Sequence, residues 1–502
     1  MQQHEIVIVG SGLGGLACGA ILAKEGLQVC IIEKNRQIGG TLQTFVRDKT
    51  IFDSGVHYVG GLEKGQNLYQ IFKYLGIMDK LKIKRMDEDA FDVVLFGGDP
   101  KVYRYAQGYD RFIGKLTAEF PEDEAAIRKY CDFMQKVCSK FPLYNLRSGN
   151  YFDKEGVLEI DTQTFFESIT DNKKLQSVLA GNNILYAGVP YKTPFYVHAL
   201  IINSYIESSW RFVDGGSQIA KFIAKEITSR GGIIRRNTKV TRLIEEEGKL
   251  QFAETDDGQK IHGKIFISNM HPHNTMEITK SQLIKQAYRN RINTLENTVS
   301  VFYLNVVMKR DTFRYRNHNV YYYAENDSWC ALNYDEETWP LGYAMFFAAS
   351  SSSPEYANAV TVMSYMRYEE VEKWKHTVNT SSNDISRGED YELFKKEKAE
   401  KLLKCVEEKF PGIRNCVQSY YVATPLSVRD YIGTHDGSLY GVGKDYRESM
   451  KTFISPRTKI PNLFLTGQNL NLHGVLGVSV SALVTCSEIL GMDYLTEKIR
   501  NA

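Results

Sequence analysis

The sequence predicts an α/β fold in two parts: a parallel-sheet domain assembled from three separated pieces of chain, and a second domain of mixed α+β structure. Three segments lead to this prediction. The first thirty or so residues predict a strand, a glycine-rich turn, a helix and a second strand, the smallest unit of a parallel sheet. "GGSQIAKFIAKEITSRGGIIRRNTKVTRLIEEEGKLQFAETDDGQKIHGKIFISN" predicts a helix followed by strands, and "NLFLTG" repeats the strand-to-glycine pattern near the C-terminus.

The N-terminal unit begins with "EIVIVG", a short apolar run of mostly β-branched residues that glycine ends, as in a buried parallel strand. From Leu13 to Lys24 apolar residues recur at helical spacing, and "LQVCIIE" then predicts a second buried strand. A G-x-G-x-x-G pattern lies at the turn, and an acidic residue ends the second strand. This is the context of a Rossmann-type dinucleotide site.

Each residue of this pattern has a physical task. Gly10 allows a tight turn, Gly12 lets the backbone approach a diphosphate, and Gly15 lets the helix pack on the strand. The helix N-terminus offers N–H groups to phosphates, and Glu33 can accept hydrogen bonds from ribose hydroxyls. The expected cofactor contacts here are Gly10, Gly12, Leu13, Gly14, Gly15, Glu33 and Lys34.

Two segments beyond the second strand favour FAD over NAD. "QIGGTLQTF" places a second glycine pair just past that strand, where an NAD-binding unit usually continues into an ordinary helix. "IFDSGVHYVGG" adds an apolar, glycine-rich segment with few charges. A second segment whose backbone can come close to a cofactor suits a cofactor longer than NAD. The contacts expected here are Gly39, Gly40, Thr41, Gly55, Val56 and His57.

The middle and C-terminal segments complete the predicted cofactor domain. "TKVTRLIEEEGKLQFAETDDGQKIHGKIFISN" predicts a three-stranded antiparallel meander with turns at Gly248 and at 257–258. "VLGVSVSALVTCSEILG" predicts a buried, uncharged helix whose N-terminus faces the negative charge of a reduced flavin. The contacts expected in these segments are Val240, Gly467, Gln468, Gly474, Leu476, Gly477 and Val478.

The predicted cofactor domain is therefore discontinuous. It comprises residues 1–90, 210–275 and 455–502, and the substrate domain comprises 91–209 and 276–454. The substrate domain is rich in tyrosine, as in "NVYYYAENDSW".

Composition excludes some functions. A formal net charge of only +2 gives no electrostatic support for nucleic-acid binding. Eight scattered cysteines without C-x-x-C or metal-like spacing fit a reduced, cytoplasmic compartment and no bound metal. A strand begins within four residues of the N-terminus, which leaves no room for a signal peptide. The longest uncharged stretch, 461–487, contains polar groups that lipid would penalise, so we expect it to be buried in protein.

One segment suggests peripheral membrane contact. "KYLGIMDKLKIKR", residues 73–85, mixes five basic residues with apolar ones, a composition that can rest on anionic headgroups. An ordinary helix-to-strand connection with solvated lysines is the other interpretation.

The chain resembles the phytoene desaturase superfamily of FAD enzymes, which shares its architecture with the amine oxidases. The N-terminal unit, "GGTLQTF", "DSGVHYVGG" and "ISNMHP" carry this resemblance. "ATPLSVRDYIGTHDGSLYGVGKDY" and "IPNLFLTGQNLNLHGVLGVSVSA" are closer to its retinol saturase and carotenoid isomerase branch. Carotene desaturases carry an hPGxG segment before the last helix, and "NLNLHGVLG" stands there instead. This departure favours saturation over desaturation.

The resemblance implies chemistry at a C=C bond of a conjugated, lipophilic small molecule such as a retinoid or carotenoid. Saturation needs a proton as well as a hydride, and His57, Tyr58 and His473 are the candidate acids. A flavin amine or amino-acid oxidase and a polyene isomerase without net redox change remain alternatives. So does a flavin-free binding module of the GDP-dissociation-inhibitor type, against which the intact glycines and Glu33 argue. The substrate, the flavin's redox partner and the oligomeric state stay open.

Overall fold

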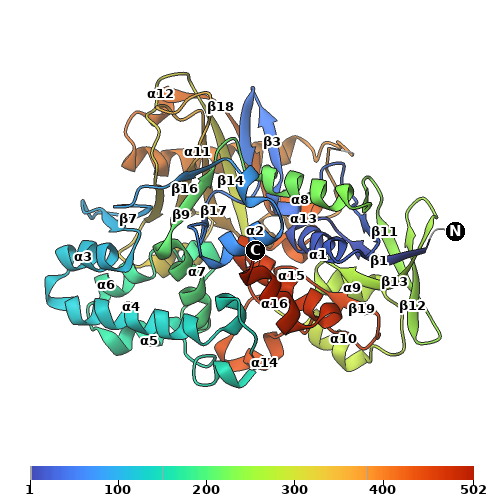
Figure 1. Ribbon diagram of the computed structural model, residues 1–502. Helices are drawn as coiled ribbons and strands as arrows, with labels where there is room; N and C mark the ends of the chain where they lie inside the picture. The colour runs from blue at the N-terminus through green and yellow to red at the C-terminus, as the bar shows by residue number, and fades with distance from the viewer. Residues whose placement is uncertain (1–2, 150, 382) are drawn as a thin grey trace.

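The computed structural model describes residues 3–149, 151–381 and 383–502. Over these residues the strands form two seven-stranded sheets, a three-stranded sheet and a two-stranded hairpin. Figure 1 shows one large sheet at the right of the molecule and the other at the upper left, with a helical lobe below the second.

The cofactor sheet has the order β10-β2-β1-β13-β12-β11, and β19 pairs with β13. The strands β10, β2, β1, β13 and β19 are parallel, whereas β11, β12 and β13 form an antiparallel meander. The strands are β1 (Gln3–Val9), β2 (Val29–Ile32), β10 (Ile233–Arg235), β11 (Val240–Glu246), β12 (Lys249–Thr255), β13 (Lys260–Ser268) and β19 (Leu463–Leu465). The predicted parallel sheet and meander are both present.

Helices cover both faces of this sheet, which explains its uninterrupted apolar strands. In β1, Ile6 and Ile8 pack toward one face, while Val7 and Val9 pack toward the other. The first face is covered by α1 (Leu13–Lys24), α8 (Ser217–Ser229), α15 (Gly474–Leu490), α2 (Asn67–Tyr74) and α16 (Met492–Arg500). The second is covered by α9 (Pro272–Ile278) and α10 (Gln286–Asn293).

The second large sheet, here called the upper sheet, has the order β18-β14-β17-β16-β15-β7-β8. Its strands are β7 (Asp92–Phe96), β8 (Tyr103–Tyr105), β14 (Ser300–Met308), β15 (Asn319–Tyr323), β16 (Gly342–Phe347), β17 (Ala359–Met366) and β18 (Val417–Ala423). Every residue of β14 through β17 is buried, because other elements cover both faces.

The remaining helices lie around the upper sheet and below it (Figure 1). They are α3 (Tyr109–Glu119), α4 (Glu124–Ser139), α5 (Thr162–Ile169), α6 (Lys173–Leu179), α7 (Phe195–Glu207), α11 (Glu389–Lys409), α12 (Ile413–Cys416), α13 (Pro425–Ile432) and α14 (Ser449–Thr452). The small strands are β3 (Thr44–Arg47), β4 (Thr50–Asp53), β5 (Val59–Gly60), β6 (Ile83–Arg85) and β9 (Ser209–Phe212).

The strands of each large sheet come from the chain pieces assigned to the corresponding domain, but the packing is less cleanly divided. Met276, Ile292, Val442 and Ile454 all belong to the core on the second face of the cofactor sheet. The sequence placed these residues in the substrate domain. Apolar periodicity shows that a helix has a buried face, but not which sheet that face covers.

Segment 73–85 does not offer the apolar surface that the membrane interpretation needs. Its apolar side chains Tyr74, Leu75, Ile77 and Met78 belong to the buried core. Two of its lysines form ion pairs, Lys73 with Asp79 and Lys80 with Glu226. This segment is therefore an ordinary packed connection.

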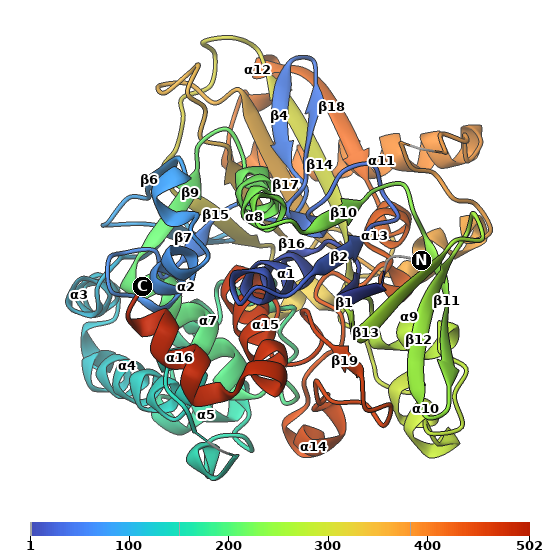
Figure 2. The ribbon, with the colours of Figure 1, turned by 45° about the vertical axis from the view of Figure 1, so that its right-hand side comes forward.

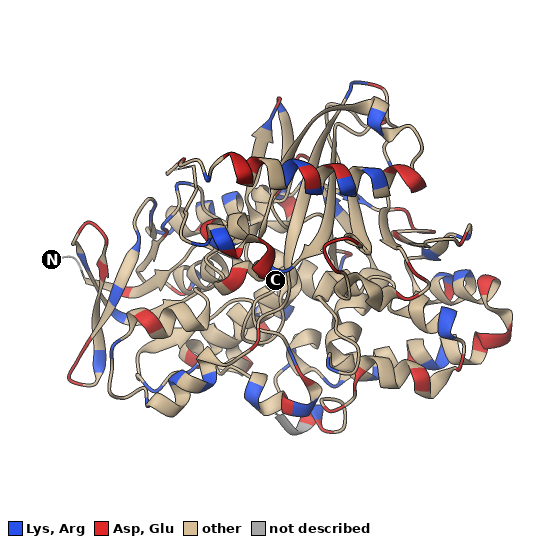
Figure 3. Ribbon diagram, turned by 180° about the vertical axis from the view of Figure 1, so that it is seen from behind, with Lys and Arg blue, Asp and Glu red and all other residues tan. Residues whose placement is uncertain are grey.

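No helix in the described part of the chain is long and apolar enough to cross a membrane. The uncharged stretch 461–487 instead supplies β19 and α15, which pack inside the protein. Basic and acidic residues are mixed over the helices rather than gathered by sign (Figure 3).

Candidate active site

The glycine-rich turn after β1 has the conformation that its pattern requires. Gly10 has φ +96°, a region that favours glycine. A Cβ at Gly15 would lie 2.1 Å from the Gly10 carbonyl oxygen, so only glycine lets α1 start this close to the strand. Gly12 is the N-cap of α1, and the first N–H groups of the helix are open to an anion.

Asn269, directly after β13, lies where three chain segments meet. A Cβ at Gly12 would lie 2.7 Å from Asn269 Nδ2, and a Cβ at Gly14 or Gly467 would lie 2.5 or 2.7 Å from Oδ1. Among the described residues, no hydrogen bond occupies the Asn269 side-chain amide. A polar amide thus faces the helix N-terminus, at the carboxyl edge of the sheet where such folds bind ligands.

Glu33, at the end of β2, is 6% exposed and binds the glycine turn itself. Its Oε2 accepts hydrogen bonds from Ser11 N at 2.9 Å and Ser11 Oγ at 2.6 Å. Its Oε1 accepts one from Asn35 N at 2.8 Å. Two carboxylate oxygens offer about four acceptor positions, so capacity remains for a ribose hydroxyl.

The second glycine pair packs directly on the first. Gly12 and Gly39 form a parallel bridge, and a Cβ at Gly40 would lie 3.2 Å from the Gly12 Cα. Gly40 begins a short 3-10 turn that contains Thr41. Gly55 follows β4, and a Cβ there would lie 3.2 Å from the Thr41 Cβ. The segments predicted to contact the cofactor are therefore contiguous in space.

Four residues predicted to contact the cofactor have another partner or a buried position in the structure. Lys34 Nζ donates a hydrogen bond to the Asp430 carbonyl oxygen at 2.9 Å. Gly477 leaves room for the connection before α15, since a Cβ there would lie 2.7 Å from the Leu472 carbonyl oxygen. Val240 is buried at the start of β11, and Val56 is buried after β4. Cofactor contact at these four positions stays a prediction.

The connection between β19 and α15 holds the other predicted cofactor residues. Gly467 has φ +102° and approaches Gly14, while His473 is the N-cap of α15. Lys444 fixes this connection: its Nζ donates hydrogen bonds to the carbonyl oxygens of Asn469 at 3.2 Å and Leu470 at 3.1 Å. Burial lowers the pKa of Lys444 to about 8.

These features fit a dinucleotide cofactor with a ring system at its far end. The paired glycine turns leave no room for side chains, Glu33 keeps acceptor capacity that a ribose hydroxyl could use, and the Asn269 amide lies between the turns. No described side chain caps the N-terminus of α15, so its first-turn N–H groups are open to an anion. Across the described residues, no group of His, Cys, Asp and Glu side chains could hold a metal ion.

A cavity of about 550 Å³ extends from the first turn of α15 toward the surface. Its wall is mostly apolar and includes Leu200, Ile201, Leu472, Leu476 and Val480. The titratable side chains Lys154, Lys444, Glu488, His473 and the tyrosines Tyr144, Tyr196 and Tyr205 also line it. We call this the apolar cavity.

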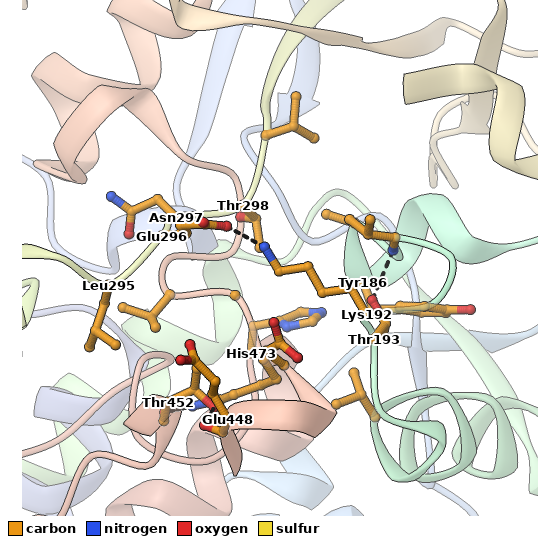
Figure 4. Close-up of a pocket in the computed structure, with 18 of the residues that line it drawn as sticks. Tyr186, Lys192, Thr193, Leu295, Glu296, Asn297, Thr298, Glu448, Thr452 and His473 are labelled. Carbon is orange, nitrogen blue, oxygen red and sulfur yellow. Dashed lines mark hydrogen bonds and ion pairs between the residues drawn. The ribbon is translucent and has the colours of Figure 1, made fainter. Parts of the chain in front are cut away.

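A second, smaller cavity of about 230 Å³ shares part of its wall with the first. Figure 4 shows its polar lining, which includes the Lys192–Glu296 ion pair and Glu448. Lys444, Asn471, Leu472 and His473 border both cavities, so the connection before α15 is the partition between them.

The three candidate acids occupy different environments. His473 lines both cavities, and its Nε2 donates to the Leu185 carbonyl oxygen at 2.9 Å. Its ring stacks on Tyr440 at 4.0 Å. Burial lowers the His473 pKa to about 4, so the imidazole is neutral at pH 7.

His57 and Tyr58 line neither of the two cavities in the described part of the chain. His57 stacks on Phe346 at 4.3 Å, and burial lowers its pKa to about 3. Tyr58 donates its hydroxyl proton to Asp92 at 2.8 Å and therefore accepts from Tyr321 at 2.7 Å. Burial raises the pKa of Asp92 to about 6.

The comparison with known families now decides the class of protein. The family model of flavin containing amine oxidoreductases matches residues 13–490. The chain belongs to this family. Its members carry a flavin, so this protein is a flavin-dependent oxidoreductase. We call the space between the paired glycine turns and Asn269 the cradle, and the flavin is expected to bind there.

Relatives within the family support the predicted branch. The chain is 27% identical to an all-trans-retinol 13,14-reductase of Homo sapiens, over 97% of this chain and 86% of the relative. It is 24% identical to prolycopene isomerase 2 of an Oncidium hybrid cultivar, over 99% and 85%. The resemblance to the retinol saturase and carotenoid isomerase branch is confirmed.

Solved structures support the fold. An oxidoreductase of Methanosarcina mazei superposes with a TM-score of 0.63 at 15% identity, covering 95% of this chain and 99% of that one. The predicted α/β architecture is therefore confirmed.

Sequence reasoning missed Asn269, Ser11 and Lys444. Asn269 could have been found, because it follows a predicted parallel strand next to β1, where ligands bind in such sheets. Lys444 gave no signal, since it lies in an irregular loop far along the chain from the residues it holds.

Proposed function

We propose that this protein binds FAD and reduces one carbon–carbon double bond of a conjugated, apolar substrate of the retinoid or carotenoid kind. The apolar cavity carries the proposal, because its wall includes the first turn of α15, from Gly474 to Gly477. Its volume of about 550 Å³ lies within the range typical of pockets for one small-molecule ligand.

FAD, rather than a smaller flavin, is supported by the dinucleotide features at the far end of the site. The open N-terminus of α1, the Asn269 amide and Glu33 suit a diphosphate and a ribose. A cofactor without these groups would leave that part of the cradle without a function.

When bound, the flavin supplies the transfer of reducing equivalents to or from carbon. The chain must then hold the polyene against α15, exclude water and supply a proton. We propose His473 as the predicted candidate that touches substrate, since it lies in the cavity wall. As a neutral imidazole it would orient the substrate or a water molecule instead of acting as a charged acid.

Tyr58 and Asp92 are proposed to act through Tyr205. Tyr205 lines the apolar cavity, and its ring packs on the Tyr58 ring at a centroid distance of 4.4 Å with the planes tilted by 33°. The hydrogen bonds of Tyr58 to Asp92 and Tyr321 fix the orientation of the Tyr58 ring, which Tyr205 contacts. Tyr58→Phe is therefore expected to raise KM more than it lowers kcat.

Two alternatives make different demands on the cavity. An unpaired acid would favour a charged amine substrate, but the acid in the cavity wall, Glu488, is ion-paired with Arg457. A polyene isomerase needs the same apolar cavity, and the prolycopene isomerase relative gives that alternative its support. Only the products separate reductase from isomerase.

The deciding experiment is anaerobic incubation of the reduced protein with a panel of retinoids and carotenoids. Reduction of one double bond adds two mass units and removes absorbance at long wavelength. An isomer of unchanged mass would replace reduction by isomerisation. In a separate incubation of the oxidised protein, rapid flavin reduction by amines, with polyenes unchanged, would identify an amine oxidase.

A further inference from the structure

The mouth of the apolar cavity carries unusual exposed apolar residues. Met450 is 64% exposed and Phe453 is 47% exposed, although both line the cavity. They are three residues apart, on α14 and its C-cap, so they lie on one face of this short helix. Half-buried Phe141, Leu158 and Met492 line the same cavity.

The backbone that presents these side chains is held in place. Arg291 Nη1 donates hydrogen bonds to the carbonyl oxygens of Lys451 at 2.8 Å and Phe453 at 3.0 Å. Lys444 Nζ donates to the Thr452 carbonyl oxygen at 2.9 Å. Thr452 and Ile454 point into the protein. Exposure of Met450 and Phe453 is thus built into the fold, not the result of a loose loop.

The same segment is basic. Residues 444–459 contain five basic residues, namely Lys444, Arg447, Lys451, Arg457 and Lys459, against the two acidic residues Asp445 and Glu448. Arg447 and Lys459 are exposed and form no ion pair with a described acidic residue. Exposed apolar side chains surrounded by surplus basic charge match the interface of an anionic bilayer.

We propose that the face formed by α14 and the cavity mouth docks on an anionic lipid bilayer, with Met450 and Phe453 inserted among the acyl chains. α14 projects at the lower edge of the molecule in both views (Figures 1 and 2). Docked in this way, the apolar cavity opens directly into the membrane, and a lipophilic molecule enters or leaves without crossing water. The exposed residues Arg447 and Lys459 then contact headgroup phosphates.

The test is vesicle sedimentation of the flavin-loaded protein without substrate, so its outcome is independent of the proposed reaction. Phosphatidylcholine vesicles with and without phosphatidylglycerol serve as the two surfaces. We expect binding to the anionic vesicles that weakens as salt rises. Met450→Ser combined with Phe453→Ser should lower the partition coefficient by about tenfold or more.

Leu393→Ser is the matched control, because Leu393 is 56% exposed on α11 and does not line the cavity. It should bind vesicles as the unmodified protein does. Arg447→Glu with Lys459→Glu should abolish the preference for anionic vesicles. Circular dichroism and flavin content establish that each variant is folded.

Three results would overturn the proposal. One is an unmodified protein that sediments with neither kind of vesicle. Another is a Met450 and Phe453 double variant that binds as well as the control. The third is a dimer in solution that this double variant dissociates, which would assign the face to self-association.

Discussion

Glu33 joins the cofactor site to the turn that forms it. Its carboxylate accepts two hydrogen bonds from Ser11, between the first two motif glycines, and is expected to accept one from a ribose hydroxyl. We therefore predict that Glu33→Ala lowers flavin affinity by about ten- to more than a hundredfold, from roughly 1.5–3 kcal/mol for charge-assisted hydrogen bonds. Flavin absorbance after gel filtration measures this loss. Normal flavin content would place the ribose elsewhere.

Gly467 tests the close approach of the C-terminal turn to Gly14. Gly467→Ala places a Cβ 2.7 Å from Asn269 Oδ1, within the cradle. We predict that this variant folds but retains little flavin.

Gly258→Ala is the matched control for this change. Gly258 also has positive φ, +79°, but a Cβ there meets nothing within 4 Å. The backbone strain is thus common to both variants, whereas the clash is specific to Gly467. Equal flavin content in the two variants would contradict the proposal that the flavin binds between the glycine turns and Asn269.

At the scale of elements, the connection between β19 and α15 separates the two cavities. The side-chain ammonium group of Lys444 holds this connection in place. Lys444→Met would leave three backbone carbonyl oxygens without their donor. We predict a loss of roughly 1.5–3 kcal/mol in the free energy of unfolding, together with lower flavin content. Urea unfolding and flavin absorbance measure the two effects.

Lys459→Met is the control for this prediction, because Lys459 is exposed and holds no described backbone carbonyl. It should unfold at the same urea concentration as the unmodified protein. If both lysine variants were equally stable, the connection would be held by other contacts.

Local patterns predicted some elements well and others poorly. α1 spans Leu13–Lys24 as its apolar spacing indicates, and the meander turns at Gly248 and Gly258, both with positive φ. α16 was missed, because Gly491 ends α15 and the amphipathic residues beyond it were not recognised as a separate helix. Segment 73–85 was ambiguous because exposure of its apolar residues depends on what packs above them.

At the scale of the whole molecule, the apolar cavity lies where separate parts of the chain come together. Figure 2 shows α15 and α16 beside α1 and α7, and the cavity is lined from α7, α14 and α15. Residues nearly 300 positions apart, such as Leu185 and His473, are joined by one hydrogen bond. Ligand binding should therefore stabilise the association of all these parts.

The buried histidines predict loss of stability in acid. Burial lowers the pKa of His57 and His198 to about 3, and of His271 and His473 to about 4, from 6.5. The unfolded chain therefore binds more protons at these sites, so stability falls as pH drops from 6.5 toward 4. Each histidine contributes on the order of 1–2 kcal/mol between pH 6.5 and 5.

Asp53 and Asp92 oppose this effect, since burial raises their pKa values from 3.8 to about 7 and about 6. The folded state holds extra protons there, and stability falls as pH rises from 4 toward 7. Burial also lowers the pKa of His318 to about 4, so five histidines outnumber these two carboxyls. We therefore predict a lower melting temperature at pH 5 than at pH 7. His198→Gln should narrow this difference. A higher melting temperature at pH 5 would mean that the carboxyls dominate.

The sequence by itself determined the fold of the cofactor domain. Its glycines, the β-branched strands and Glu33 act through local geometry and short-range packing, which single segments specify. The relative order of these segments was enough to indicate the family. Tertiary structure alone decided the rest: that Asn269 lies between two glycine turns, that Lys444 holds the partition between the cavities, and that the Tyr58 hydroxyl donates a hydrogen bond to Asp92. These contacts join residues far apart in sequence, and their distances depend on how whole layers pack, which no local pattern records.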